Sequence, residues 1–219
     1  MARVIIFGIK DLAELAHYYL QSDSEHEVVA FSVNKEYTSQ NNSFKGLPVI
    51  PFEDVEKYYK PSEYYFFAPL THKGLNKPRE RVYQEIKSKG YKMINYISSR
   101  AIISDNVIIG ENCFILENVV IQPYVKIGNN DIIWSNCVIS HHTTVRDSVF
   151  LAPSVSISGN CLIESYCFFG IGSTIRDSIK ISEGSFISMG ACITKETESY
   201  TMYQGLPGRK VKKIVEGEF

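Results

Sequence analysis

The chain has 219 residues, a formal net charge of −1 and 44% hydrophobic residues, which suits one large domain or two small ones. It contains no long basic run, so nucleic acid and anionic membranes are poor candidates as partners. No apolar run is long enough to span a membrane, and the apolar part of the N-terminus is too short for a signal peptide. We therefore expect a cytoplasmic protein.

Residues 1–96 alternate predicted strands with predicted helices, which favours a small parallel α/β sheet. The predicted strands are Arg3–Phe7, Glu27–Val33, Tyr64–Ala68 and Tyr91–Tyr96. Three helices are predicted. The first is capped by Asp11, with Glu14 at the capping-box position, and the second is a short helix near Phe52–Tyr59 that follows Leu47–Pro51. The third is Leu75–Lys89, which ends at Gly90. Residues 35–46, including Ser39–Asn41, are predicted to form a polar loop.

Ligands of parallel sheets bind beyond the carboxyl ends of the strands, which here are Gly8–Lys10 and Ser32–Asn34. The dinucleotide fingerprint G-x-G-x-x-G is absent, because Gly8 is followed by Ile9, Lys10 and Asp11. This argues against a site for NAD. A mononucleotide or a sugar nucleotide stays open as the ligand.

A six-residue repeat dominates the rest of the chain. Seventeen consecutive positions spaced six apart, from Ile97 to Ile193, are apolar, and fourteen of them are Ile. A period of six fits neither an α-helix nor a simple strand and is typical of a parallel β-helix built from hexapeptide turns. With three hexapeptides per turn, we expect eighteen residues per rung, nearly six rungs over residues 97–198, and a tail at 199–219.

Four of the five cysteines, Cys113, Cys137, Cys161 and Cys167, stand four residues after a repeat position. A small side chain that points into a tight coil explains this spacing, since free Cys behaves as a small buried hydrophobe. We therefore expect structural thiols rather than nucleophiles or disulfides.

Two of the five histidines, His141 and His142, lie in the coil, at the third and fourth positions of one hexapeptide. Histidine titrates near neutral pH and is the usual general base, and an imidazole at a corner of the coil can meet a neighbouring subunit. The alternative is a solvated turn, which the nearby Trp134 makes less attractive.

Gly159 stands eighteen residues, or one rung, beyond His141. Its backbone N–H could donate to an oxyanion beside the base, although Ser158-Gly159-Asn160 could equally form a simple tight turn. Further glycines, whose backbone no side chain covers, follow in Gly170-Ile171-Gly172-Ser173 and at Gly190.

The tail carries basic residues that could hold phosphates or could simply be solvated: Arg209, Lys210, Lys212 and Lys213. We expect no metal, because adjacent histidines should point in different directions and the coil has no third histidine.

At this point the chain resembles a known family, the sugar acyltransferases of the sialic-acid O-acetyltransferase and bacillosamine N-acetyltransferase type. In the first part the shared motifs are the strand ending in Gly8, Phe31–Asn34, Gly46-Leu47-Pro48-Val49 and Gly74-x-Asn76-x-x-Arg79. In the coil they are Trp134-Ser135-Asn136, Ser140-His141-His142, Ala152-Pro153, Gly159, Phe169-Gly170-Ile171-Gly172 and Gly205-Leu206-Pro207-Gly208.

The resemblance implies a Rossmann-like nucleotide-sugar domain (1–96) joined to a left-handed parallel β-helix (97–198), in a homotrimer with active sites between subunits. It implies His141 as general base and Gly159 as the amide that contacts the acyl carbonyl. His142, which we group with them as catalytic, stands where family members often carry Asp or Glu.

The resemblance also implies two binding regions. Residues expected along the coenzyme A groove are Gly159, Gly170, Ile171, Gly172, Ser173, Gly190, Gly205, Pro207, Arg209 and Lys210. Residues expected at the sugar nucleotide are Gly8, Ile9, Lys10, Asp11, Val33, Asn34, Asn76 and Trp134.

Residues and resemblance together predict an acetyl-CoA-dependent N-acyltransferase that acts on a nucleotide-linked amino sugar in surface glycan biosynthesis. Two alternatives remain open: O-acetylation of a sugar such as sialic acid, and a non-catalytic protein that binds a sugar nucleotide. Replacement of the family's acidic residue by His142 is the one feature that favours the non-catalytic alternative.

Overall fold

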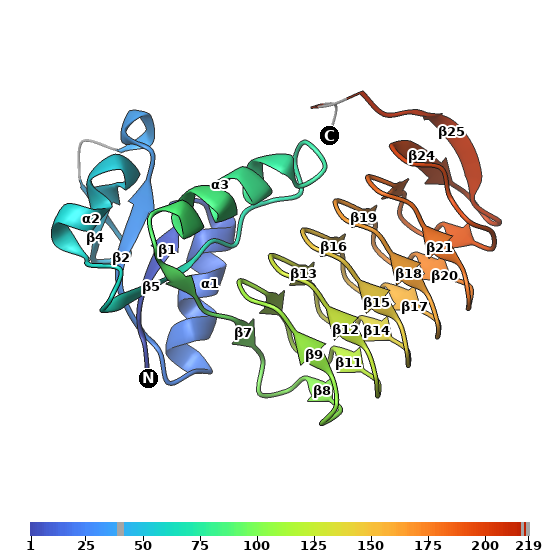
Figure 1. Cartoon of the computed structure of the whole chain (residues 1–219), viewed down its shortest axis with the longest axis horizontal. Helices are drawn as coiled ribbons and strands as arrows, with labels where there is room; N and C mark the ends of the chain where they lie inside the picture. The colour runs from blue at the N-terminus through green and yellow to red at the C-terminus, as the bar shows by residue number, and fades with distance from the viewer. Residues whose placement is uncertain (39–41, 216, 218–219) are drawn as a thin grey trace.

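The computed structural model describes residues 1–38, 42–215 and 217, and consists of an α/β sheet followed by a three-sided coil (Figure 1). The predicted polar residues Ser39–Asn41 lie outside the described residues. Within the described ranges, no helix has the length and apolar character needed to cross a bilayer.

The first sheet has the strand order β3-β4-β2-β1-β5-β6, and every pair is parallel except β3 with β4. Its strands are β1 (Arg3–Phe7), β2 (Glu27–Val33), β3 (Ser43–Phe44), β4 (Leu47–Pro51), β5 (Tyr64–Phe67) and β6 (Lys92–Met93). The predicted α/β sheet is therefore confirmed, and its first two strands have the predicted bounds.

Helices cover both faces of this sheet. They are α1 (Asp11–Ser22), α2 (Val55–Tyr58) and α3 (Lys77–Ser88), with short 3₁₀ turns η1 (Lys35–Tyr37) and η2 (Phe52–Asp54). Alternate residues of β1 point to opposite faces, so Val4 and Ile6 pack with α1, whereas Ile5 and Phe7 pack with α2 and α3.

Several predicted boundaries are wrong at the residue level. Lys10, not Asp11, is the N-cap of α1, and it makes no side-chain capping bond. Helix α3 begins at Lys77 rather than Leu75, because Leu75 and Asn76 have φ of 49° and 64°, outside the helical region. Part of the predicted loop 35–46 forms η1 and β3.

The predicted strand Tyr91–Tyr96 is two strands in different sheets, β6 and β7 (Tyr96–Ile97). Asn95 stands between them, and its side chain donates to the carbonyl of Gly110 and accepts from the N–H of Cys113. These bonds to the next rung end the first sheet and start the coil.

The coil is a left-handed parallel β-helix whose strands pair with equivalents eighteen residues away, as Ile97 with Ile115 and Ile121 with Ile139. The first coil sheet contains β7, β10 (Phe114–Ile115), β13 (Ile132–Ile133), β16 (Phe150–Leu151), β19 (Phe168–Phe169) and β22 (Phe186–Ile187). The second contains β8 (Ile102–Ile103), β11 (Val120–Ile121), β14 (Val138–Ile139), β17 (Ser156–Ile157), β20 (Thr174–Ile175) and β23 (Cys192–Ile193). The third contains β9 (Ile108–Ile109), β12 (Lys126–Ile127), β15 (Thr144–Val145), β18 (Leu162–Ile163) and β21 (Lys180–Ile181).

The fourteen repeat positions from Ile115 to Ile193 form the buried core of the coil, as predicted from the six-residue period. At the start of the coil Ile103 and Ile109 are partly buried against this core, and Ile97 is 38% exposed. Cys113, Cys137, Cys161 and Cys167 lie in the same core as free thiols, which confirms that they face inward. Each fully buried Ile contributes on the order of 1.5–3 kcal/mol of hydrophobic stabilisation.

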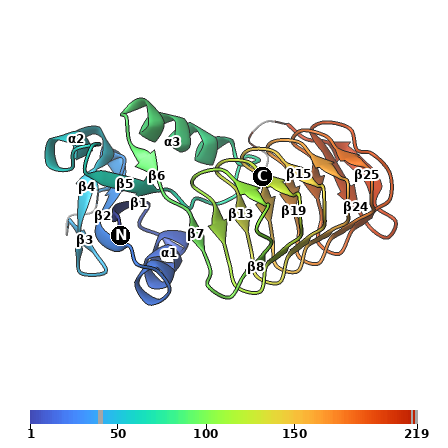
Figure 2. The same ribbon diagram turned by 60° about the horizontal axis from the view of Figure 1, so that its bottom comes forward.

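The first coil sheet packs against the first sheet and α1. Outward-facing Phe114, Ile132 and Phe150 share one buried cluster with Ala16 and Leu20 of α1. Figure 2 shows the first sheet and its helices at one end of the coil, joined through β7. The carboxyl ends of β1 and β5 therefore lie near the first coil sheet.

The predicted tail is a hairpin, β24 (Thr201–Gln204) with β25 (Arg209–Lys213), in which β24 extends the first coil sheet beside β22. Tyr203 of β24 lies in the coil core, and its hydroxyl oxygen accepts a hydrogen bond from the backbone N–H of Glu198 at 2.8 Å. The hairpin therefore closes the last rung of the coil.

Candidate functional site

His141 and His142 lie in the corner between the second and third coil sheets. We call this the histidine corner and define it as Ser140–Thr143 with the equivalent residues of the neighbouring rungs. Both histidines are exposed in the single chain. The backbone N–H of His141 donates to Oε1 of Gln122, 3.0 Å away on the previous rung.

Gly159 lies directly against the ring of His141. A Cβ added to Gly159 would be 2.6 Å from Cε1 and 2.8 Å from Nε2 of His141, so any larger residue would displace the ring. Two bonds place this backbone: Asn160 N–H donates to the carbonyl of His141 at 3.0 Å, and Thr143 Oγ1 donates to the carbonyl of Ser158 at 3.0 Å.

The backbone N–H of Gly159 has no hydrogen-bond acceptor among the described residues, although Gly159 is buried. A buried unpaired N–H costs free energy unless a ligand or water accepts it. The histidine corner therefore places a free donor beside an imidazole, which is the pairing that a base-assisted acyl transfer needs.

The two histidine rings meet, and the expectation that they point in different directions is wrong. Their Nδ1 atoms are 3.2 Å apart, so one ring donates and the other accepts. His142 adopts the left-handed corner conformation, with φ of 60°, and this turns its side chain back toward its neighbour. Tyr124, one rung earlier, stacks on His142 with ring centroids 4.7 Å apart; sequence reasoning missed this residue.

The predicted sugar-nucleotide residues after β1 and β2 gather at the carboxyl edge of the first sheet. The N–H of Gly8 donates to the carbonyl of Ser32 at 2.8 Å, which joins the two strand ends. Lys10 and Asp11 are exposed, Ile9 and Asn34 are half-buried, and Val33 is buried. Asp11 also lines a cavity of about 350 Å³ along α1.

Asn76 and Trp134 lie in the seam between the first sheet and the coil. Asn76 has no exposed surface, and its side-chain amide donates to the carbonyl of Cys167 at 3.2 Å. Trp134 is half-buried beside Phe150, and its Nε1 is buried without a hydrogen-bond partner among the described residues. In this structure Asn76 joins the two parts of the chain, and no surface of it is open to a ligand.

Three of the glycines expected along the coenzyme A groove, Gly170, Gly172 and Gly190, lie in a different corner, between the first and second coil sheets. We call this the glycine corner and define it as Gly170–Ser173 with Ser188–Ala191. Gly172 and Gly190 have positive φ and open space where a Cβ would stand, whereas a Cβ on Gly170 would collide with the backbone of Met189. Ser173 is buried, whereas Ile171 is 56% exposed.

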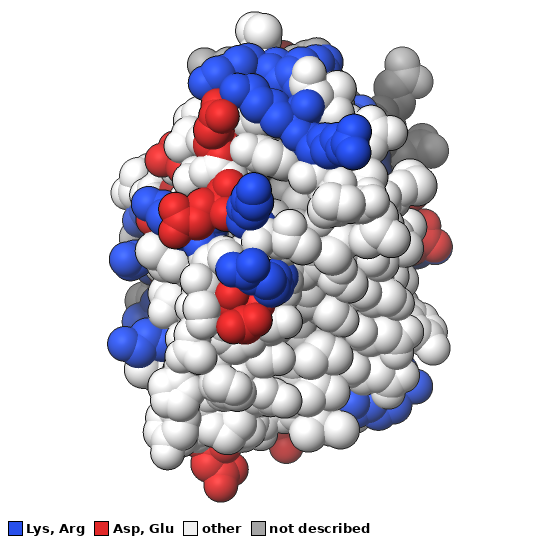
Figure 3. Space-filling view, turned by 90° about the vertical axis from the view of Figure 1, so that its right-hand side faces the viewer, with Lys and Arg blue, Asp and Glu red and all other residues white. Residues whose placement is uncertain are grey.

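The hairpin places a basic surface above the glycine corner. Gly205, Pro207, Arg209 and Lys210 are exposed, and Lys212 and Lys213 follow on β25. Figure 3 shows a band of Lys and Arg side chains at this end of the molecule and a broad uncharged area of the coil below it. Lys210 pairs with Glu198 at 2.6 Å.

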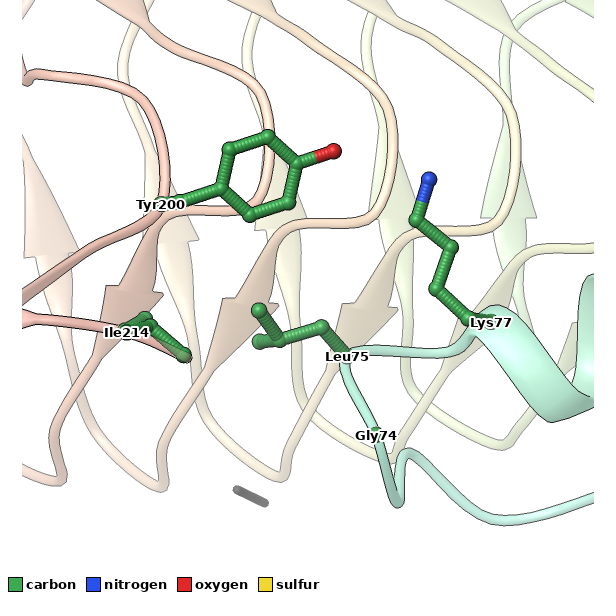
Figure 4. Close-up of a pocket in the computed structure, with 5 residues that line it drawn as sticks. All are labelled: Gly74, Leu75, Lys77, Tyr200 and Ile214. Carbon is green, nitrogen blue, oxygen red and sulfur yellow. The ribbon is translucent and has the colours of Figure 1, made fainter. Parts of the chain in front are cut away.

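A cavity of about 400 Å³ lies between the loop that precedes α3 and the C-terminal hairpin (Figure 4). It is lined by Gly74, Leu75, Lys77, Tyr200 and Ile214. Lys77 lies over the ring of Tyr166, with Nζ 3.3 Å from the ring centroid. This cavity is on the side of the first coil sheet, away from the histidine corner.

One chain therefore does not bring all the predicted residues together. His141, His142 and Gly159 share the histidine corner, whereas the glycine corner is at the other edge of the second coil sheet. The carboxyl edge of the first sheet faces the first coil sheet. Among the described residues, no group of three or more His, Cys, Asp or Glu side chains is arranged to hold a metal.

Comparison with known families identifies the repeat. Residues 106–141 match the family model described as bacterial transferase hexapeptide (six repeats). The chain carries the bacterial transferase hexapeptide repeat. This match covers β9 to β14 and reaches His141. No curated protein matches the chain by sequence.

Solved structures share the whole architecture. A mutant of perosamine N-acetyltransferase from Caulobacter crescentus, in complex with CoA and GDP-perosamine, superposes with a TM-score of 0.84 at 17% identity, covering 97% of this chain and 98% of that one. The acetyltransferase domain of PglB from Neisseria gonorrhoeae FA1090, in complex with acetyl coenzyme A, gives 0.82 at 18% identity, covering 95% and 98%. WeeI from Acinetobacter baumannii AYE gives 0.80 at 20% identity, covering 96% and 100%. This hexapeptide-repeat chain thus has the fold of those proteins over nearly its full length.

Proposed function

We propose that this protein is an acyltransferase that moves an acyl group, acetyl in the first instance, from coenzyme A to the amino group of a nucleotide-linked sugar. The contact between the His141 ring and the Gly159 backbone carries the proposal, because it joins a base and a free amide donor. Similar structures with bound CoA and GDP-perosamine support the reaction class and the kind of acceptor.

The proposed reaction is a direct transfer. The sugar amine attacks the thioester carbonyl, and His141 Nε2 takes the proton that the amine loses. The N–H of Gly159 donates to the oxyanion of the tetrahedral intermediate. Coenzyme A then leaves as its thiolate. We propose no acyl-enzyme, since Cys113, Cys137, Cys161 and Cys167 are buried in the coil core, where burial raises the pKa of each thiol.

The glycine corner and the hairpin support a donor site. Bare backbone at Gly172 and Gly190 lets a thin pantetheine chain approach closely, and exposed Ile171 offers it apolar contact. Arg209 and Lys210 on the hairpin would hold the phosphates. We further propose that residues 1–96 bind the sugar nucleotide through Gly8–Asp11 and Val33–Asn34.

The separation of these regions supports a homotrimer with each site shared between neighbouring copies. Twelve outward positions flank the strands of the second coil sheet, and only Arg176 among them is charged. On the third coil sheet four of ten equivalent positions are charged: Lys126, Arg146, Glu164 and Lys180. An uncharged face between the histidine and glycine corners suits packing against another copy. Surface glycan biosynthesis in the cytoplasm is the setting that we propose for this reaction.

The test is thiol release from acetyl-CoA in the presence of UDP-, dTDP- and GDP-linked amino sugars and free sialic acid. We expect release with one nucleotide-linked amino sugar and a loss of turnover of roughly 10²–10⁴-fold in His141→Asn, with unchanged thermal unfolding. Release with sialic acid alone would replace the N-acyl proposal by O-acetylation. Equal turnover in His141→Asn would remove His141 from the mechanism.

A further inference from the structure

Three corners of the coil place an aromatic ring on a residue with left-handed backbone conformation. Fourteen corner positions, spaced six apart from Asn112 to Gly190, have φ between 57° and 67°. Eleven of them are small residues, Asn, Ser or Gly, and Gly and Asn accept this left-handed conformation most easily. The three exceptions are Tyr124, His142 and Tyr166.

Each exception has a local partner. Tyr166 lies under the Nζ of Lys77, so a contact with α3 accounts for it. Tyr124 and His142 are partners of each other: they lie one rung apart, and their rings stack at 4.7 Å with planes 32° apart. The bulky Tyr124 is disfavoured at a left-handed position, whereas His accepts this conformation more readily, and strained residues gather where function requires them.

The stack restrains the ring that contacts the base. His142 Nδ1 is 3.2 Å from His141 Nδ1, and a neutral imidazole can accept there through its bare nitrogen. When it does, the proton of His141 is on Nδ1, and the lone pair of His141 is on Nε2, the atom beside Gly159. A His142 ring free to rotate would not maintain this arrangement.

Charged groups are distant from this pair. The neighbouring rungs of the histidine corner carry only uncharged residues: Gln122, Pro123 and Tyr124 before it, and Ser158, Gly159 and Asn160 after it. Asp105, Arg176 and Asp177 are two rungs away, about 10 Å by strand spacing. A hydrogen bond donated by His141 to His142, rather than one to a carboxylate, is therefore the nearest means of orienting His141.

We propose that Tyr124 and His142 are positioning residues for His141: Tyr124 fixes the His142 ring, and His142 holds His141 as its Nδ1–H tautomer. The inference rests on the proposed role of His141 as base for its kinetic consequence, but the tautomer itself can be measured without substrate. Neither residue needs to touch the substrate for this role.

The first test is NMR of the full-length protein labelled with ¹⁵N at histidine, at a pH where both rings are neutral. We expect His141 of the native chain to carry its proton on Nδ1. His142→Phe keeps a ring at the corner but removes the acceptor, so His141 should move to the Nε2–H form that free imidazole favours. His142→Asn, which offers an acceptor and tolerates positive φ, is the matched control and should retain Nδ1–H.

The second test is kinetic. We expect His142→Phe to lower kcat on the order of 10- to 100-fold with little change in KM, and Tyr124→Ala to lower it less, whereas Tyr124→Phe keeps the stack and the activity. His142→Asp should restore turnover and move the acidic limb of the kcat/KM–pH profile to higher pH, because a carboxylate stabilises imidazolium.

The outcomes separate this inference from the proposed function. If the native protein releases no thiol with any acceptor, but the His141 tautomer changes in His142→Phe, the proposed function is refuted and the positioning role is supported. Native protein that is active, with the tautomer and kcat unchanged in both His142→Phe and Tyr124→Ala, would refute the positioning and leave the function standing.

Discussion

At the residue scale, glycine matters where something must approach its backbone. Gly159 has ordinary φ, so its conformational freedom is not the reason for its presence. The reason is space, because the ring of His141 occupies the position that a side chain would take. The N–H of Gly159 makes no hydrogen bond among the described residues, so it is unpaired beside the ring of His141.

This predicts that Gly159→Ala impairs chemistry more than folding. The added methyl would stand 2.6 Å from Cε1 of His141, so the ring must rotate away from the amide. Because a displacement of about 1 Å can lower turnover on the order of 10²-fold, we expect a loss of that size in kcat. The check is acetyl-CoA turnover beside thermal unfolding of the same variant.

Ser158→Ala is the matched control, since it removes a neighbouring side chain of the same corner without crowding His141. We expect its kcat within about twofold of native. A Gly159→Ala variant as active as this control would contradict the geometry of the histidine corner.

At the element scale, the carboxylate of Asp23 ties the C-terminal end of α1 to the first rung of the coil. Asp23 is the C-cap residue of α1, and its Oδ2 accepts from Tyr96 Oη at 2.8 Å and from the N–H of Ser99 at 3.0 Å. Hydrogen bonds from Ser99, Tyr96 and Ser98 lower the pKa of Asp23 to about 2, although burial acts in the opposite direction.

A lowered pKa in the folded state means that ionised Asp23 stabilises the fold. This contribution is fully present above the unfolded-state pKa of about 4 and is lost as pH falls toward 2. We therefore expect Asp23→Asn to lower the free energy of unfolding at pH 7. The difference in unfolding free energy between this variant and the native protein should narrow between about pH 4 and 2. Urea unfolding at fixed protein concentration measures the free energy of unfolding of both proteins at each pH.

Asp105→Asn serves as the control, because Asp105 is an exposed carboxylate of the coil with no hydrogen bond among the described residues. It should leave the unfolding free energy near native at every pH. If the difference in unfolding free energy between Asp23→Asn and the native protein stays constant with pH, ionisation of Asp23 is not its cause.

At the scale of the whole molecule, the arrangement of faces determines which surfaces are free. The first sheet and α1 cover the outer side of the first coil sheet, where Phe114 and Phe150 are buried. The third coil sheet carries four charged outward residues. This leaves the second coil sheet, uncharged except for Arg176, as the face that suits another copy of the chain.

We expect Val120→Glu, on strand β11 of that face, to convert the proposed trimer to monomers and to abolish the proposed acyl transfer, because a buried unpaired carboxylate is costly. Lys126→Glu, on the third coil sheet, also changes charge in a strand and should keep both properties. Sedimentation of the two variants measures whether each is an oligomer or a monomer. A trimeric, active Val120→Glu would place the interface elsewhere.

The sequence by itself determined the coil. The six-residue period determines which residues point inward. Three hexapeptides make one rung of eighteen residues, so residues eighteen apart lie side by side on neighbouring rungs. The strand pairing and the contact of Gly159 with His141 both follow from this spacing. The same local information predicted strands β1 and β2, whose apolar runs are long and bounded by polar residues.

Only the tertiary structure decided how side chains meet where backbone conformation departs from the regular pattern. The left-handed corner turns His142 toward His141 and places Tyr124 beneath it, and left-handed residues delay the start of α3. Docking of the first sheet on the coil buries Asn76 against Cys167, a contact between residues 91 positions apart. Sequence periodicity records which face a side chain occupies, whereas these contacts depend on the angles at which separate elements pack.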